Sequence, residues 1–295
     1  TLDWIIGRND VPNVINCHDH HTGLIPFMML YCHKYEKLRN VPSMITIHNG
    51  LYQGQFGFDK LYYLPEFDLA HVKVLEWDNC INSLAVAITT VSPNYLNEIN
   101  YSANGLESLF NLVRYKSKGI LNGIDIEVWD PATDVMLEKN YSIKNIEKGK
   151  QENKEKLCNL FNLDPTKPLF SFIGRLLEEK GGDLLPHAAA LALSENYQQI
   201  NILILGSGNT AIENHLNSLL QNYKGNYNTF IGYNEELAHL IYAGSDFLLM
   251  PSRVEPCGLN QMYSLRYGTI PIVRRTGGLK DTVIDFGDDG NGICH

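Results

Sequence analysis

Short apolar runs, each followed by a longer segment of mixed polarity, repeat along almost the whole chain. The runs cover residues 14–17, 43–47, 87–91, 169–173, 201–205, 229–231, 247–250 and 270–273, and the longer segments include 182–193, 211–222 and 235–242. Buried strands of about four to eight residues that alternate with helices are typical of βαβ units and parallel sheets. The sequence therefore predicts an α/β fold.

The chain is long enough for more than one lobe. Its 295 residues fit two α/β lobes of about 150 residues each. The stretch 131–168 is rich in Lys, Glu and Asn, and it contains a predicted charged helix at 153–163. Such a composition is typical of a passage between lobes. We predict a first lobe at 1–130, an interlobe segment at 131–168 and a second lobe at 169–295.

The bulk composition argues against several classes of function. The net charge of −9 disfavours wide surfaces for nucleic acid or anionic membranes. No apolar run approaches the ~18 residues that a membrane span needs. The six cysteines are widely spread without a C-x-x-C pair, so we expect reduced thiols rather than a zinc ribbon or a disulfide framework.

In the first half of the chain, polar side chains follow two predicted strands. Residues 17–24 read Cys-His-Asp-His-His-Thr-Gly-Leu, and His48 and Asn49 follow the strand at 43–47. Residues just past the carboxyl end of a parallel strand face the ligand crevice. His21, just before a Thr-Gly turn, is the better candidate for ligand contact. Asn49 is equally suited to turn chemistry and to sugar contact.

The other polar residues of the first motif have a structural interpretation. We expect His18 and Asp19 to cap the following helix and to satisfy buried backbone groups. His20 and His21 are adjacent and cannot readily share one ion with Asp19, so no metal site is predicted here.

Two cations follow the first strand of the second lobe, in Phe-Ile-Gly-Arg-Leu-Leu-Glu-Glu-Lys-Gly-Gly at 172–182. Arg175 and Lys180 are placed to neutralise a diphosphate. The alternative is a pair of solvated cations that interact with Glu178 and Glu179. Spacing alone leaves both interpretations open.

The most informative stretch is Pro-Ser-Arg-Val-Glu-Pro-Cys-Gly-Leu-Asn-Gln-Met-Tyr at 251–263, followed by 268–278. Glu255 can accept hydrogen bonds from ribose or sugar hydroxyls. Gly258 is expected to open a helix whose free backbone N–H groups can hold phosphate. The small residues 276–278 allow a ligand to approach closely. Packing alone does not explain so many glycines, prolines and charges at strand ends, so we predict a ligand site.

Together these segments resemble one family, the bacterial glycogen synthases and plant starch synthases. The matching motifs in the first part are His-Asp-x-His-x-Gly-Leu (18–24), Thr-x-His-Asn-x-x-Tyr-Gln-Gly (46–54), Val-Ser-Pro-x-Tyr (91–95) and Leu-Asn-Gly-Ile-Asp (121–125). Those in the second part are Arg-Leu-x-x-x-Lys-Gly (175–181), Gly-Tyr (232–233), Pro-Ser-Arg-x-Glu-Pro-Cys-Gly-Leu (251–259) and Arg-Arg-Thr-Gly-Gly-Leu-x-Asp-Thr-Val (274–283). They occur in the family's order across essentially the whole chain.

The resemblance implies an architecture and an activity. The architecture is GT-B, in which two Rossmann-like lobes with parallel sheets face each other across a cleft. The activity is transfer of glucose from ADP-glucose (UDP-glucose in some relatives) to the non-reducing end of an α-1,4-glucan, with retention of configuration. The expected partners are thus ADP-glucose and an α-1,4-glucan primer, with no metal or other cofactor, nucleic acid or membrane. The expected location is a bacterial cytoplasm rather than a plastid.

The resemblance also implies roles for single residues. The four that it makes catalytic are His21, Arg175, Lys180 and Glu255: Arg175 and Lys180 bind the diphosphate, Glu255 contacts the donor sugar, and His21 reaches the glucose from the first lobe. Those that it assigns to the donor and sugar pocket, together with Asn49, are Asn122, Tyr233, Cys257, Gly258, Leu259, Asn260, Thr276, Gly277 and Gly278.

The sequence departs from the family pattern in several places. The family's opening Lys-x-Gly-Gly-Leu does not occur before Trp4, the link at 80–85 is short for a helix, and the end of the usual closing helix is absent. We therefore expect a truncated or gapped chain with an incomplete first lobe. His20 replaces a Trp and Asn260 a Thr. The alternatives are another retaining GT-B glucosyltransferase that uses UDP-glucose, and a non-catalytic glucan-binding homologue.

Overall fold

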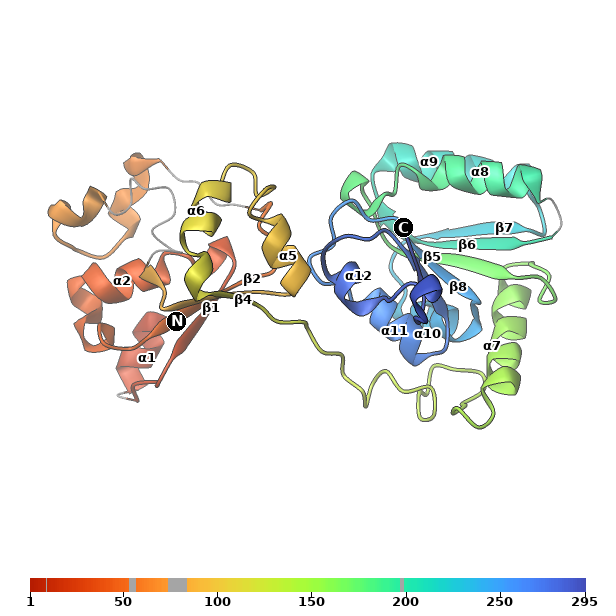
Figure 1. The fold of residues 1–295 in the computed structure, drawn as a ribbon, viewed down its shortest axis with the longest axis horizontal. Helices are drawn as coiled ribbons and strands as arrows, with labels where there is room; N and C mark the ends of the chain where they lie inside the picture. Colours follow the sequence, from red (N-terminus) through yellow and green to blue (C-terminus); the bar gives the residue numbers. More distant parts are fainter. Residues whose placement is uncertain (9, 53–56, 74–83, 197–198) are drawn as a thin grey trace. The chain divides into compact units, whose positions relative to one another are not determined.

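A computed structural model describes residues 1–8, 10–52, 57–73, 84–196 and 199–295. The chain divides into two compact units, Thr1–Leu121 and Asn122–His295. Each unit contains one fully parallel sheet with helices packed on it (Figure 1). The predicted α/β fold with two parallel sheets is confirmed.

The first unit is built on a four-stranded sheet in the order β1-β2-β3-β4. The strands are β1 (Ile15–His18), β2 (Ser43–Ile47), β3 (Ala87–Thr90) and β4 (Ser117–Gly119). The α-helices among the described residues of this unit are α1 (Leu2–Arg8), α2 (Ile25–Tyr31), α5 (Pro93–Glu98) and α6 (Glu107–Leu112). A core cluster joins Leu2 of α1 to Phe27 and Met29 of α2. The Ser92 hydroxyl accepts a hydrogen bond from the Tyr95 N–H at 2.9 Å and so caps α5.

The second unit has a six-stranded sheet in the order β10-β9-β8-β5-β6-β7. The strands are β5 (Leu169–Leu176), β6 (Asn201–Gly208), β7 (Tyr227–Ile231), β8 (Phe247–Met250), β9 (Ile270–Val273) and β10 (Ile293–Cys294). The helices are α7 (Ile146–Leu160), α8 (Leu185–Glu195), α9 (Thr210–Ser218), α10 (Glu235–Gly244), α11 (Asn260–Arg266) and α12 (Gly277–Thr282).

Strand β6 shows how this sheet buries both of its faces. Ile202 and Ile204 pack into a core with α8 and α9, whereas Leu203 and Leu205 pack into a core with α7 and α10. Successive side chains of a strand point to opposite faces, so a continuous apolar run suits a strand covered on both sides. Figure 1 shows α8 and α9 together on one face of this sheet.

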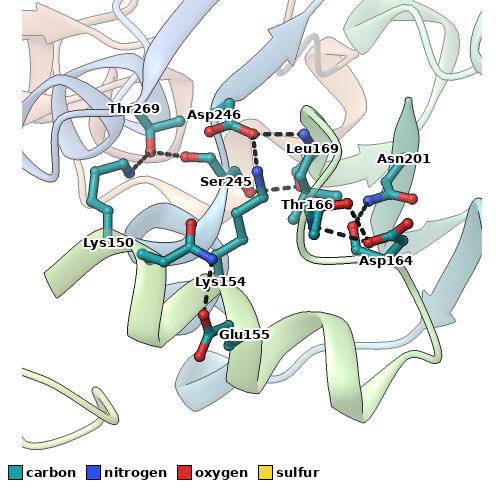
Figure 2. Close-up of polar contacts among 12 residues, drawn as sticks. Lys150, Lys154, Glu155, Asp164, Thr166, Leu169, Asn201, Ser245, Asp246 and Thr269 are labelled. Carbon is teal, nitrogen blue, oxygen red and sulfur yellow. Dashed lines mark hydrogen bonds and ion pairs between the residues drawn. The ribbon is translucent and has the colours of Figure 1, made fainter. Parts of the chain in front are cut away.

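Two lysines attach α7 to the loops around the sheet (Figure 2). Lys150 Nζ donates to Thr269 Oγ1 at 2.6 Å, as Figure 2 shows. It also donates to the Ala243 carbonyl at 3.0 Å. Lys154 pairs with Asp246 at 2.7 Å, and the same carboxylate oxygen accepts the Leu169 N–H at 2.7 Å. These contacts fix a charged helix against the unit.

Helix α7 begins at Ile146 and ends at Leu160, whereas the sequence predicted a helix at 153–163. Gly149 lies inside this helix, and its lack of a side chain leaves room for Tyr141. A Cβ at position 149 would lie 2.2 Å from the Tyr141 Cβ. The interlobe segment predicted at 131–168 is grouped with the second unit, where α7 contributes Leu157 and Cys158 to a core.

Two features of the sequence lie outside the described residues, namely most of the short link at 80–85 and the Gln-Gly pair at 53–54. Within the described ranges, no helix combines the length and the apolar character needed to cross a bilayer.

Candidate active site

The order of strands in the second unit identifies where a ligand would bind. From the central strand β5, the chain adds β6 and β7 on one side and then returns to add β8, β9 and β10 on the other. In open α/β sheets, ligands bind outside the carboxyl ends of the strands at such a reversal. The loops that follow β5 and β8 meet there, and they carry Lys180 and Glu255.

Lys180 and Glu255 form a partly buried ion pair at this position. Lys180 Nζ lies 2.7 Å from Glu255 Oε1, and the side chains are 22% and 10% exposed. The Ser252 hydroxyl donates to the second carboxylate oxygen, Oε2, at 3.0 Å. Donors from two loops therefore fix the orientation of this carboxylate. Sequence reasoning assigned no role to Ser252, although it lies inside the quoted Pro-Ser-Arg motif.

Arg175, at the end of β5, has a different environment. Its side chain is 57% exposed, and its guanidinium pairs with Glu179. Of the two interpretations left open by the sequence, pairing with a neighbouring glutamate is therefore what the structure shows for Arg175. Lys180 differs, because its carboxylate partner is Glu255 on the other loop.

The small-residue loop at 276–278 packs tightly against the backbone that follows Glu255. Gly277 has φ 46°, and a Cβ there would lie 1.9 Å from the Glu255 carbonyl oxygen. The Gly278 N–H donates to that carbonyl at 2.9 Å, and a Cβ on Gly278 would lie 2.2 Å from the Cys257 carbonyl oxygen. These glycines thus allow the loop to pack closely against the protein's own backbone. The preceding residue, Thr276, is the N-cap residue of α12.

The predicted helix start at Gly258 is displaced by two positions. Gly258 has φ 77°, a left-handed conformation, and α11 begins at Asn260. Leu259 is the N-cap residue. The Asn260 side-chain amide donates to the Ile173 carbonyl at 2.7 Å and ties the start of α11 to β5.

Asn122 and Cys257 lie next to each other in the second unit. Burial raises the pKa of the Cys257 thiol, and a hydrogen bond with the Asn122 backbone opposes that shift. The structure thus places the first residue of the unit beside the segment that carries Glu255. Tyr233 has a different setting, since it follows β7 at the edge of the sheet, is 86% exposed and donates to Glu235 at 3.5 Å.

In the first unit, His21 lies at the carboxyl end of the sheet. It belongs to a short 3-10 turn after β1, His20–Thr22. Its side chain is exposed, and the centroid of its ring lies 3.9 Å from that of the His20 ring. Asp19 precedes the turn with φ 52°. This conformation is uncommon for a residue other than glycine.

The expected capping of the following helix by His18 and Asp19 is wrong, because the N-cap residue of α2 is Leu24. The Asp19 carboxylate makes no hydrogen bond to the turn that it precedes; instead Oδ1 accepts the His48 N–H at 2.7 Å. The expectation that it satisfies backbone groups is therefore confirmed, but on the neighbouring strand's loop. His18 Nδ1 lies 2.9 Å from His48 Nε2 and links the same two loops.

The Asn49 side chain stabilises a turn in its own loop. Its side-chain oxygen accepts the Leu51 N–H at 3.0 Å and the Tyr95 hydroxyl at 3.4 Å. Of the two interpretations that the sequence left open, this one is shown, and contact with a sugar remains a prediction. Among the described residues, no three His, Cys, Asp or Glu side chains are grouped as a metal site would require.

Comparisons with known proteins agree with the fold of this chain. The family model described as "Starch synthase catalytic domain" matches residues 1–112, and the model described as "Glycosyl transferases group 1" matches residues 150–294. The catalytic domain of starch synthase IV from Arabidopsis thaliana, solved with ADP and acarbose, superposes with a TM-score of 0.89 at 32% identity, covering 99% of this chain and 64% of that one. Sucrose-phosphate synthase from Thermosynechococcus elongatus, at 17% identity and a TM-score of 0.60, shares the fold over 99% of this chain and 62% of its own.

The fold and the matches place the chain in the GT-B class of glycosyltransferases. The chain belongs to the glycogen synthase and starch synthase family within that class. The glycogen synthase of Flavobacterium johnsoniae is 77% identical across all of this chain, and that of Myxococcus xanthus is 43% identical across 96% of it. The chain spans 63% and 61% of the length of these two bacterial relatives.

Proposed function

We propose that this chain transfers glucose from ADP-glucose to the non-reducing end of an α-1,4-glucan, with retention of the anomeric configuration, in a bacterial cytoplasm. The main support is the oriented Glu255 carboxylate paired with Lys180 at the reversal of strand order. The starch synthase IV structure was solved with ADP and acarbose, which supports a nucleotide-activated donor and a glucan acceptor for this chain.

The electrostatics of the site fit the breaking of a glycosyl–phosphate bond. That step develops positive charge on the sugar and negative charge on the departing diphosphate. Lys180 and Arg175 supply the cations that stabilise the diphosphate, typically the largest catalytic contribution. Both are paired with carboxylates in the present structure, so the diphosphate would share or replace Glu255 and Glu179 as their partner.

The remaining assignments concern sugar hydroxyls and the acceptor. Asn122 would hold hydroxyls of the glucose, so that the orientation of the sugar is set before the reaction. The sugar contact of His21 stays a prediction. As the bond from the anomeric carbon to phosphate breaks, the acceptor hydroxyl attacks on the same face and its proton passes to the departing phosphate. This route needs no second carboxylate, metal or other cofactor. Trapping of a covalent glucosyl-enzyme would contradict it.

Calorimetric titration of the chain with ADP and, separately, with UDP tests the proposal. We expect binding of ADP in preference to UDP, and a loss of about tenfold or more in affinity in Lys180→Ala, because a charge-assisted contact to phosphate is removed. Lys148→Ala is the matched control, since that lysine is 78% exposed on α7.

Each other outcome changes the conclusion in a defined way. Preference for UDP would keep the family and replace the donor. Equal loss in Lys148→Ala would show that the effect is not local to the site. Failure of the unaltered chain to bind either nucleotide would contradict the proposed donor site and favour the alternative of a glucan-binding homologue.

A further inference from the structure

The loop that carries Lys180 and the loop that carries Glu255 are joined by a second, more extensive contact. Arg253 Nη1 and Nη2 donate to the two carboxylate oxygens of Asp183 at 2.5 Å and 2.8 Å. Arg253 Nη1 also donates to the Glu178 carbonyl at 2.6 Å. One guanidinium thus holds both ends of the 178–183 segment, and its contact with Asp183 is the planar bidentate pair that is typical of arginine and carboxylate.

The backbones of the two loops are also in direct contact. The Arg253 and Val254 N–H groups both donate to the Glu179 carbonyl, at 2.8 Å and 3.1 Å. Gly181 has φ 70°, and a Cβ there would lie 2.4 Å from the Pro251 carbonyl oxygen. The residues on either side of Lys180 are therefore both fixed against the loop that carries Glu255.

The segment that needs this support is short. Lys180 ends a three-residue 3-10 turn, Glu178–Lys180. Such turns have poorer hydrogen-bond geometry than an α-helix and little stability of their own. The position of the Lys180 ammonium hence depends on contacts that the turn makes with other segments.

We propose that Arg253 and Asp183 are positioning residues, which hold the 178–183 segment against the loop at 251–255 so that Lys180 lies at Glu255. An isolated, half-exposed ion pair contributes little to stability. Here the same guanidinium that makes the bidentate contact also holds the Glu178 carbonyl. Loss of this contact would therefore release Lys180 more than it would destabilise the fold. The consequence for nucleotide binding rests on the proposed function, whereas the consequence for Lys180 itself does not.

The direct test measures how fast the Lys180 amine reacts with an acetylating reagent, by mass spectrometry, with Lys148 as internal reference. Arg253→Lys keeps the charge but loses the bidentate geometry, and Asp183→Asn keeps the shape but loses the charge. We expect labelling of Lys180 to rise about three- to tenfold in each, because one or two charge-assisted hydrogen bonds are lost. The double variant Arg253→Asp/Asp183→Arg should recover part of the protection.

The matched control is Arg266→Lys, in an exposed pair with Asp130 of 2.9 Å elsewhere in the same unit. Unchanged labelling in both Arg253→Lys and Asp183→Asn overturns the inference, and so does an equal rise in Arg266→Lys. ADP titration of the same variants, with an expected loss of about tenfold in affinity, reads the functional consequence. Absence of ADP binding in the unaltered chain would count against the proposed function and leave the labelling result to decide the positioning role.

Discussion

Gly277 shows how one missing side chain shapes the site. Its position against the Glu255 carbonyl leaves no room for a Cβ. We expect Gly277→Ala to lower the free energy of unfolding by about 1–3 kcal/mol more than Gly225→Ala does. Gly225 also has a positive φ, 85°, but faces open space, so it reports the backbone strain alone. Chemical denaturation of the two variants compares them, and equal losses would contradict the crowding seen at Gly277.

The environment of the Asp134 carboxylate predicts how the stability of the protein changes at low pH. Burial raises the pKa of this carboxyl, but hydrogen bonds from His239 at 2.7 Å and from the Tyr267 hydroxyl at 2.5 Å outweigh burial, so the pKa lies below the ordinary 3.8. A carboxyl whose pKa is lowered by folding stabilises the protein above its unfolded pKa and loses that contribution as pH falls through the folded one.

Replacement of this carboxylate should therefore matter most near neutral pH. We expect Asp134→Asn to cost about 1–3 kcal/mol at pH 7, and the difference from the unaltered chain should shrink below about pH 4. Denaturant titrations between pH 7 and pH 3 measure it. A difference that stays constant over that range would show that ionisation of Asp134 is not involved.

At the scale of elements, α7 offers two lysines in opposite surroundings. Lys150 donates to Thr269 and to carbonyls near the end of α10, whereas Lys148 is 78% exposed. We expect Lys150→Met to lower the free energy of unfolding by about 2–3 kcal/mol, since buried acceptors lose their donor. Lys148→Met should change it by less than about 0.5 kcal/mol. Thermal denaturation of both compares them, and similar effects would mean that these contacts do not stabilise α7.

Elements and site differ in how far the sequence predicts them. Long apolar runs such as β6 were predictable, because burial on both faces leaves an unbroken apolar pattern. Strand β4 is Ser-Lys-Gly and β10 has two residues, so neither carries such a pattern. Lys180 and Glu255 were identified through family motifs, but their pairing and the contact of Arg253 with Asp183 depend on which strands become neighbours. Strand order is a property of the whole sheet that no local window contains.

At the scale of the whole molecule, each unit has cores of its own. Among the described residues, the cluster around Phe27 contains residues of the first unit alone, and the clusters around Ile204, Tyr267 and Leu203 contain residues of the second unit alone. We expect a chain of residues 122–295 to fold by itself, with a cooperative melting transition and slow hydrogen exchange in β5 and β6. An unfolded or aggregated product would show that the second unit depends on the first.

The reversal of strand order also has a consequence for folding. Lys180 and Glu255 are 75 residues apart, and the loops that carry them follow β5 and β8, which pair although β6 and β7 lie between them in the sequence. Contacts between distant segments must overcome a large loss of chain entropy and therefore form late. A nascent second unit would thus have to pair β8 with β5 before the loops that carry Lys180 and Glu255 could hold a nucleotide together, so the ion pair would report that this pairing has formed.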